Sequence, residues 1–168
     1  LGNLSAVTKL ILNGDVTNTP TFTANLPKAI DANGYNITAD SSIDVTGVAF
    51  SNVNNLTITD GVTLTLSAAQ ASAFNNTDGT TIALNASGVA AVTAGGNLSG
   101  LNLANVTLTL NAATTLPDST AELPKALDAG GFTSIVVGNL NLSNTTLSNP
   151  GDFEVSSGSL TVSVSQAN

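Results

Sequence analysis

The chain has no histidine, cysteine, methionine or tryptophan, and its only basic side chains are Lys9, Lys28 and Lys125. General acid–base catalysis relies most often on His, and nucleophilic catalysis on Cys, Lys, or a Ser with a neighbouring base. A pair of carboxylates is the remaining option, but such a site also needs groups that hold the substrate. With one Tyr and five Phe, the chain has few aromatic side chains that could hold a substrate. The composition therefore argues against an enzyme.

Charge is scarce and mostly negative. Charged residues make up 8% of the chain, the formal net charge is −8 and the isoelectric point is about 4.1. An acidic chain repels nucleic-acid phosphates and anionic lipid headgroups. No apolar run approaches the roughly 20 residues of a membrane-spanning helix. We therefore expect no nucleic-acid partner and no membrane insertion.

The absence of cysteine fits a secreted protein, because oxidation can neither crosslink nor damage such a chain. No signal peptide is visible, and the first residue is Leu rather than Met. We expect a segment that is processed or excised from a longer chain.

The strongest positive feature is an internal repeat. Residues 26–35 read LPKAIDANGY and residues 123–132 read LPKALDAGGF, with seven of ten positions identical. The same offset of 97 aligns 17–61 with 114–158, and LTLSAAQA then matches LTVSVSQA after a one-residue deletion. Self-similarity of this kind is typical of repeat architectures. We expect repeat unit one at 1–97 and a truncated unit two at 98–168, packed as two domains or as one continuous solenoid.

Short alternating stretches fill each unit. Two apolar residues flanking one polar residue place two side chains on the same strand face, and Gly, Asn and Asp stand between the pairs, where a chain turns. The pairs of unit one are Ile43/Val45, Val48/Phe50, Leu56/Ile58 and Leu64/Leu66. Strands this short suit a mainly β fold, namely a parallel β-solenoid (β-helix-like) of stacked coils in two tandem repeats.

Two short helices per unit are predicted beside these strands. LPKAIDAN (26–33) has Pro early and Gly34 just beyond its end, and in the second copy Ser119 and Glu122 have the spacing of a capping box. A capping box also starts SAAQASAF (67–74), with Ser67 and Gln70 as its two members.

Tandem units with LPKALDAGG and LTLSAAQA in an acidic, Thr/Asn/Ala-rich chain resemble repeats of large secreted bacterial surface proteins. These include surface-layer (S-layer) proteins and adhesins exported by type I secretion. The resemblance implies an extracellular or cell-surface location and a role in coats, filaments or adhesion. Many such proteins bind calcium through G-G-x-G-x-D, but neither Gly pair here continues in that way.

Three acidic residues are weak candidates for another calcium site. Asp40 and Asp44 lie four positions apart, and Asp60 is expected one coil away. In the second copy these positions are Val137, Asn141 and Ser157, which favours a role in turns and solubility over metal binding. No other cofactor is expected.

Thr-x-Thr stretches at 57–59, 63–65 and 107–109 are similar to the arrays of ice-binding solenoids. Such arrays need a flat face with a constant coil period. Thr is also generally favoured on exposed strand faces, and that reading is preferred here.

The sequence thus predicts a structural, non-enzymatic, extracellular segment of a self-assembling surface layer or filament. It would associate with itself through strand edges or solenoid ends. The alternative is an adhesin module that binds a carbohydrate or a protein, with a cell-surface glycan as one candidate partner. An adhesin should carry an aromatic or charged recognition patch, and no such patch is evident in the sequence.

Overall fold

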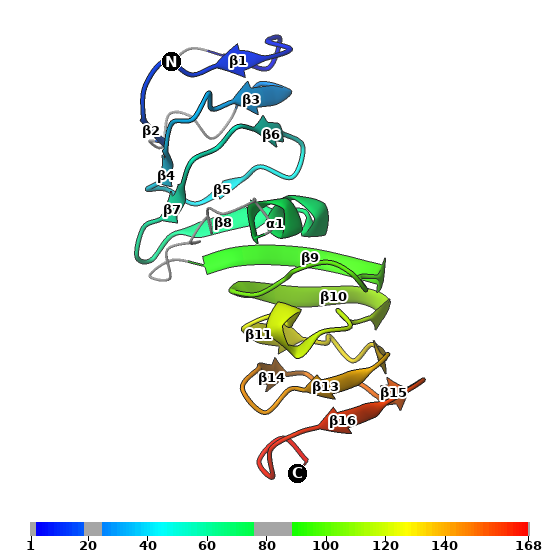
Figure 1. Cartoon of the computed structure of the whole chain (residues 1–168). Helices are drawn as coiled ribbons and strands as arrows, with labels where there is room; N and C mark the ends of the chain where they lie inside the picture. The colour runs from blue at the N-terminus through cyan, green and yellow to red at the C-terminus, as the bar shows by residue number, and fades with distance from the viewer. Residues whose placement is uncertain (1–2, 19–24, 76–88, 168) are drawn as a thin grey trace.

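The computed structural model describes residues 3–18, 25–75 and 89–167. It is mainly β, and its parallel strands stack into a β-solenoid of about seven turns (Figure 1). The described part of the N-terminal region lies at one end of the stack and the C-terminus at the other. The fold class predicted from the alternating pattern is confirmed.

In the first copy the described strands lie on three faces of the solenoid. The first face is β1 (Leu10–Ile11), β3 (Ala29–Asp31) and β6 (Ala49–Ser51). The second face is β2 (Val16–Asn18), β4 (Ile37–Ala39) and β7 (Leu56–Ile58). The third face starts with β5 (Ile43–Asp44) and β8 (Thr63–Leu66).

The described remainder contains two longer strands and six short ones. The longer strands are β9 (Val89–Asn97) and β10 (Val106–Thr115). The short strands are β11 (Ala126–Asp128), β12 (Ser134–Val136), β13 (Asn139–Asn141), β14 (Thr146–Ser148), β15 (Phe153–Val155) and β16 (Ser159–Thr161).

The two repeat copies place their strands at matching positions. β3, β4, β6 and β7 recur 97 residues later as β11, β12, β14 and β15 with the same bounds. Leu10 pairs with Ile30 and Ile30 with Phe50, so one coil takes about 20 residues, and Leu127 pairs with Leu147 in the same way. The sequence repeat is therefore also a repeat of backbone structure.

Stacking continues from one copy into the next with a change of face. β8 pairs with β9, β9 with β10, and β10 with β11. β11 corresponds to β3, a first-face strand, whereas β8 belongs to the third face. The second copy is consequently rotated by one face about the solenoid axis.

Aliphatic ladders fill the interior. Leu66 pairs in register with Val92, and the ladder continues through Leu108 and Leu127 to Leu147. All except Leu147 are almost completely buried. The inward positions predicted in unit one are confirmed as well, since all eight residues of the four apolar pairs are buried or half-buried.

Of the short helices predicted for the two units, only the one at 67–74 forms in the described chain. The segment 67–74 is α1 (Ala68–Asn75), as predicted. The prediction for 26–33 was wrong: Ala29–Asp31 is strand β3, because its pairing with β1 and β6 outweighs a weak local preference for helix. In the second copy the same block forms β11, preceded only by the short 3₁₀ turn η2 (Thr120–Glu122), whose Ser119 makes no side-chain capping bond.

The Gly and Asn residues of the repeated block form a left-handed corner instead of ending a helix. Asn33 and Gly34 have φ of 51° and 84°, and Gly130 and Gly131 have φ of 55° and 78°. Asn and Gly are the residues that tolerate this region best. This shared requirement explains why Asn and Gly exchange between the copies.

Replacing Leu108 by Ala in the middle of the long ladder should lower the free energy of unfolding by about 2–5 kcal/mol, because it leaves a cavity between closely stacked coils. The matched variant Thr107→Ala changes the neighbouring, outward-facing side chain and should cost less than about 1 kcal/mol. Denaturant unfolding of both variants measures the difference. Equal losses would mean that the faces of β10 are assigned the wrong way round.

Candidate functional site

The predicted calcium candidates do not gather into a metal site. Within the described residues, no three acidic side chains lie close enough together to hold an ion. Asp44 uses its Oδ1 to accept bonds from the Thr46 N–H (2.9 Å) and hydroxyl (2.8 Å). Asp40 and Asp60 are both exposed, and Asp60 lies in the turn before β8. Asp44 thus serves its own turn, the role preferred from the sequence.

Of the Thr-x-Thr stretches, 63–65 and 107–109 lie in β8 and β10 of the longest sheet and 57–59 begins in β7 of another sheet, and the threonines do not form a continuous ladder. Thr65 pairs with Ala91, and Thr107 with Ala126. Thr109 lies between Thr93 and Asp128. Alanine and aspartate therefore interrupt the hydroxyl rows, which argues against a regular ice-binding surface.

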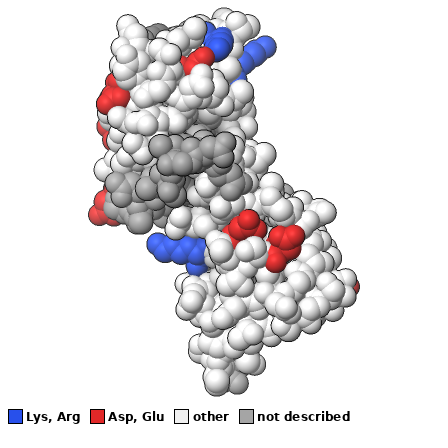
Figure 2. Space-filling view, viewed as in Figure 1, with Lys and Arg blue, Asp and Glu red and all other residues white. Residues whose placement is uncertain are grey.

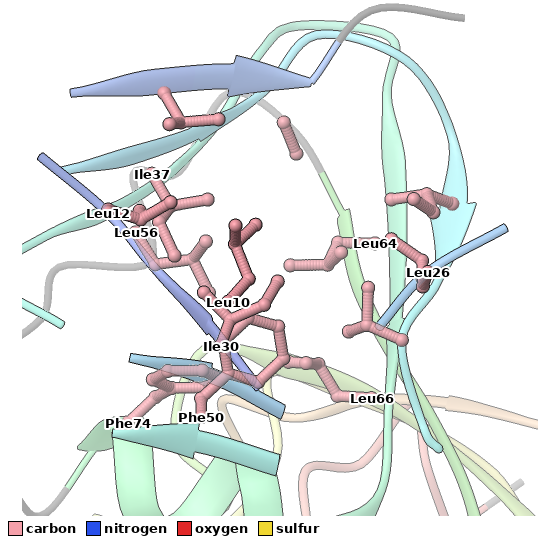
Figure 3. A pocket seen from close by; sticks show the side chains of 14 residues that line it. Leu10, Leu12, Leu26, Ile30, Ile37, Phe50, Leu56, Leu64, Leu66 and Phe74 are labelled. Carbon is pink, nitrogen blue, oxygen red and sulfur yellow. The ribbon is translucent and has the colours of Figure 1, made fainter. Parts of the chain in front are cut away.

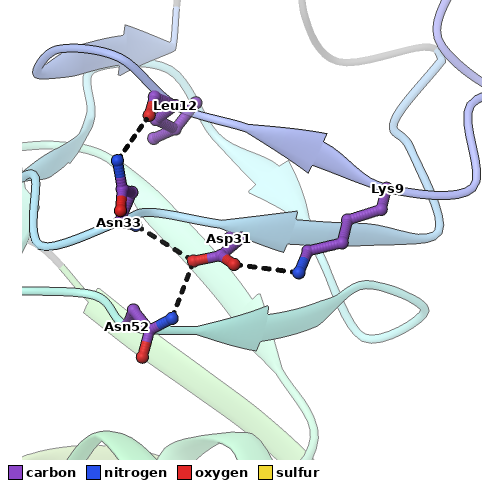
Figure 4. Close-up of polar contacts among 5 residues, drawn as sticks. All are labelled: Lys9, Leu12, Asp31, Asn33 and Asn52. Carbon is purple, nitrogen blue, oxygen red and sulfur yellow. Dashed lines mark hydrogen bonds and ion pairs between the residues drawn. The ribbon is translucent and has the colours of Figure 1, made fainter.

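Asp31 is the centre of a polar cluster on the first copy (Figure 4). Its Oδ1 accepts bonds from the Asn33 N–H (3.1 Å) and from the Asn52 Nδ2 one coil away (2.8 Å). Its Oδ2 lies 2.9 Å from the Lys9 Nζ, on the coil before. One carboxylate thus joins three successive coils.

These contacts shift the acidity of Asp31. The bond from Lys9, followed by those from Asn52 and Asn33, lowers its pKa to about 2. Each bond stabilises the charged form of the carboxylate. A second, smaller example lies at Asp15, where the backbone N–H and the side-chain amide of Asn36 lower the pKa.

The amide half of the Asp31 cluster is repeated in the second copy. Asp128 accepts bonds from the Gly130 N–H (3.0 Å) and from the Asn149 Nδ2 (3.1 Å). Lys9 has no counterpart there, because Thr107 precedes the ladder residue Leu108. The carboxylate–amide pair therefore belongs to the repeat, and the lysine is particular to the first copy.

A second repeated feature is a half-buried glutamine that holds a corner of the coil in place. The side-chain amide of Gln70 donates to the carbonyls of Val45 (2.8 Å) and Val48 (2.6 Å), and its Oε1 accepts from the Ser67 N–H (2.7 Å). Gln166 makes the same set of bonds, to Leu142 (2.8 Å), Thr145 (2.7 Å) and Ser163 (2.7 Å). We call this arrangement the glutamine latch.

Beyond the glutamine latch, α1 is fixed to the coil that follows it. The Asn75 Nδ2 donates to the carbonyls of Asn102 (3.0 Å) and Ala104 (2.9 Å). The Asn102 N–H donates to the Ser72 Oγ (3.0 Å). The helix therefore joins the two copies through side-chain hydrogen bonds as well as through packing.

Two hollows were considered as ligand sites. A cavity of about 50 Å³ lies inside the first copy (Figure 3), and a groove of about 180 Å³ lies between β6 and α1. Ligand pockets usually measure about 300–1,000 Å³ and present several polar groups. The cavity is lined only by apolar side chains, among them Leu10, Ile30, Leu56 and Phe74. It is a gap in core packing.

The visible surface offers little for charge-based recognition. Figure 2 shows only a few acidic and basic side chains, scattered over a surface that is otherwise uncharged.

Ser134 is a buried polar group: it is 1% exposed, and its hydroxyl has no hydrogen-bond partner. It lies in β12 between Thr114 and Phe153, away from any nucleophile–base arrangement.

Comparisons with protein-family models, with curated proteins and with solved structures give no match. In the described part of the chain, none of the helices has the length and apolarity needed to cross a membrane.

Sequence reasoning missed the Asp31 cluster and recognised only half of the glutamine latch. Asp31 and Asp128 lie inside the most similar repeat block, and each is followed 21 positions later by Asn. That spacing is one coil, so it could have indicated the contact. Gln70 was recognised only as a capping residue, because the two carbonyls that it binds belong to the preceding coil, 25 and 22 residues earlier in the chain.

Asp31→Asn should remove a pH-dependent part of the stability. An ordinary Asp titrates near pH 4 when unfolded, and the folded pKa is about 2. The stabilisation is therefore complete above about pH 4 and is lost as the pH falls toward 2. The stability difference between wild type and Asp31→Asn, measured by denaturant unfolding, should shrink over this range. Lys9→Met removes the largest cause of the lowered Asp31 pKa and should therefore narrow the pH range over which this stabilisation is lost. A stability difference between wild type and Asp31→Asn that does not change with pH would contradict this account.

Gln70→Ala should lower the free energy of unfolding by about 2–4 kcal/mol, because it leaves two carbonyls without their donors and removes one cap. Gln70→Glu is the matched variant: it keeps the capping oxygen but cannot donate. Thermal and denaturant unfolding should show that Glu restores little of the loss. Full recovery of the unfolding free energy in Gln70→Glu would mean that capping, and not the bonds to the preceding coil, accounts for the stabilisation.

Proposed function

We propose that the chain is a structural, non-enzymatic, extracellular segment of a self-assembling bacterial surface layer or filament. The repeat blocks that resemble secreted surface proteins motivate the location. The solenoid supports the mechanical role, because continuous backbone hydrogen bonding and interlocked aliphatic ladders make a stiff rod. The scarcity of charge fits a surface that packs against copies of itself.

The observation that carries this proposal lies at the last coil. We call strands β14, β15 and β16 the C-terminal edge. In the described chain each of these strands has a strand partner on one side only. Such an edge is a template for pairing with another strand unless charge, proline or a covering segment blocks it.

The C-terminal edge has few of these blocking features. β14 and β16 carry no charge and no Pro, and Glu154 in β15 is the only charged residue of the three strands. Val155 is 45% exposed, whereas its counterpart in the first copy, Ile58, is 1% exposed. Addition of a further coil would bury this apolar surface, and repeated addition in one direction gives an open filament.

The test compares the native chain with Val162→Lys/Val164→Lys at rising concentration. Light scattering and electron microscopy should show assembly of the native chain and a loss of assembly in the variant. Thr107→Lys/Thr109→Lys adds the same charge on an outward face away from the C-terminal edge and should assemble normally. A native chain that stays monomeric throughout would favour the adhesin alternative, in which the partner is a glycan or another protein.

A further inference from the structure

The C-terminal edge repeats a surface that the first copy keeps covered. Its counterpart is β6, β7 and β8, where α1 lies against β6 and β9 pairs with β8. We propose that the C-terminal edge is a docking surface for a helix–strand segment with the chemistry of residues 68–97. This inference concerns the same C-terminal edge as the proposed function and goes beyond it by naming a helix–strand segment as the occupant of that edge.

The helix covers β6 through an aromatic contact. The Phe74 ring of α1 lies 5.5 Å from the Phe50 ring, tilted by 59°. Phe50 is the last member of the ladder that starts at Leu10 and Ile30. Leu147 ends the corresponding ladder in the second copy, and like Phe50 it is half-buried. Among the described residues, no helix lies beside Leu147 to supply the apolar side chain that Phe74 supplies in the first copy.

The strand covers β8 through a parallel ladder. Leu64 pairs with Ala90, and Leu66 pairs with Val92, so both leucines are buried. Their counterparts Leu160 and Val162 are only half-buried. The same inward positions are therefore formed in β16 and the residue after it, without the strand that would complete them.

The second copy already forms the start of the covering segment. Its glutamine latch is intact at Gln166, and the Ala167 N–H donates to the Ser163 carbonyl at 3.1 Å. The Ala71 N–H makes the corresponding bond to Ser67 at 3.0 Å in α1. Ala71 is fully buried under the rest of its coil, whereas Ala167 is exposed. The first helical bond is in place at the position from which a covering helix would continue.

The chemistry of the partner follows from these matches. Residues 68–75 and 89–97 contain no charged side chain, and neither do β14 and β16. The helix must present an aromatic residue four positions after the latch glutamine, as Phe74 does after Gln70. The strand must present small apolar residues inward, as Ala90 and Val92 do. A repeat segment whose helix and strand carry no charge meets these requirements, and a peptide with charges in those two parts does not.

The experiment extends the chain in register. Residues 72–101 are joined directly after Ala167, so that Ser72 follows it as it follows Ala71 in the first copy. Hydrogen exchange in peptides spanning β14 and β16 should slow by about tenfold or more relative to the unextended chain, since the backbone of β16 becomes paired with the added strand and β14 becomes covered by the added helix. The matched control carries Phe74→Asp and Val92→Asp in the appended segment only, and it should give no protection.

Exchange in β3 and β4 reports whether the original solenoid is intact. If the extension disturbs these strands, the extended chain is replaced by a two-part experiment. A synthetic peptide of residues 67–101 is then added to the unextended chain, and protection of β16 is again the readout. Protection in either format, lost with the two aspartates, supports the proposal. Unchanged exchange at β14 and β16 in both formats overturns it.

The outcome separates this inference from the proposed function. If the native chain is monomeric and the extension still protects β16, the docking surface stands and self-assembly falls. If the native chain assembles and the extension neither protects β16 nor reduces assembly, self-assembly stands and this inference falls. Protection of β16 in the native chain that rises with concentration, with nothing added by the extension, would identify the first coil of a second copy as the occupant and count against the helix–strand segment.

Discussion

The structure depends on the backbone hydrogen bonds between one coil and the next. Strands of two or three residues have too little local preference to be stable alone, so each forms only where its neighbours in the stack hold it. Inward side chains fix the register, because a slip of one residue would turn every ladder residue outward. This condition explains why Ile30 must lie above Phe50, and why Leu66, Val92 and Leu108 recur at matching positions although the coil length between them varies.

At the corners, hydrogen bonds from polar side chains join one coil to the next. Amide groups such as those of Gln70 and Asn52 can bridge coils without the desolvation cost of a buried charge. Carboxylates bridge coils as well, at Asp15, Asp31 and Asp128, and Asp31 has partners on both neighbouring coils. Because the corner residues recur in both copies, as Asp31 and Asn52 do in Asp128 and Asn149, the same hydrogen bonds form at matching corners.

Much of the fold could be predicted from the sequence, because alternation and the repeat both survive in the printed residues. Ile43, Val45 and Leu64 were placed inward correctly, and α1 was recognised from Ser67 and Gln70. The helix predicted at 26–33 was wrong, because local capping signals cannot reveal that Ile30 pairs with Leu10 and Phe50 on other coils. The rotation of the second copy was also out of reach, since it depends on how α1 occupies the place of a strand beside β6. In the candidate site, individual acidic residues could be identified from the sequence, but their contacts with residues one coil away could not.

The central claim is that both copies form one stack, with β9 adding directly to β8. The chain has no cysteine, so pyrene can be attached to introduced cysteines alone. Thr65 and Ala91 are in register on adjacent strands, about 5 Å apart, and a Thr65→Cys/Ala91→Cys variant should show strong excimer emission that persists on dilution. Thr107→Cys/Ala126→Cys, an in-register pair within the second copy, is the positive control. Excimer emission from the control pair with none from the Thr65–Ala91 pair would contradict a continuous solenoid.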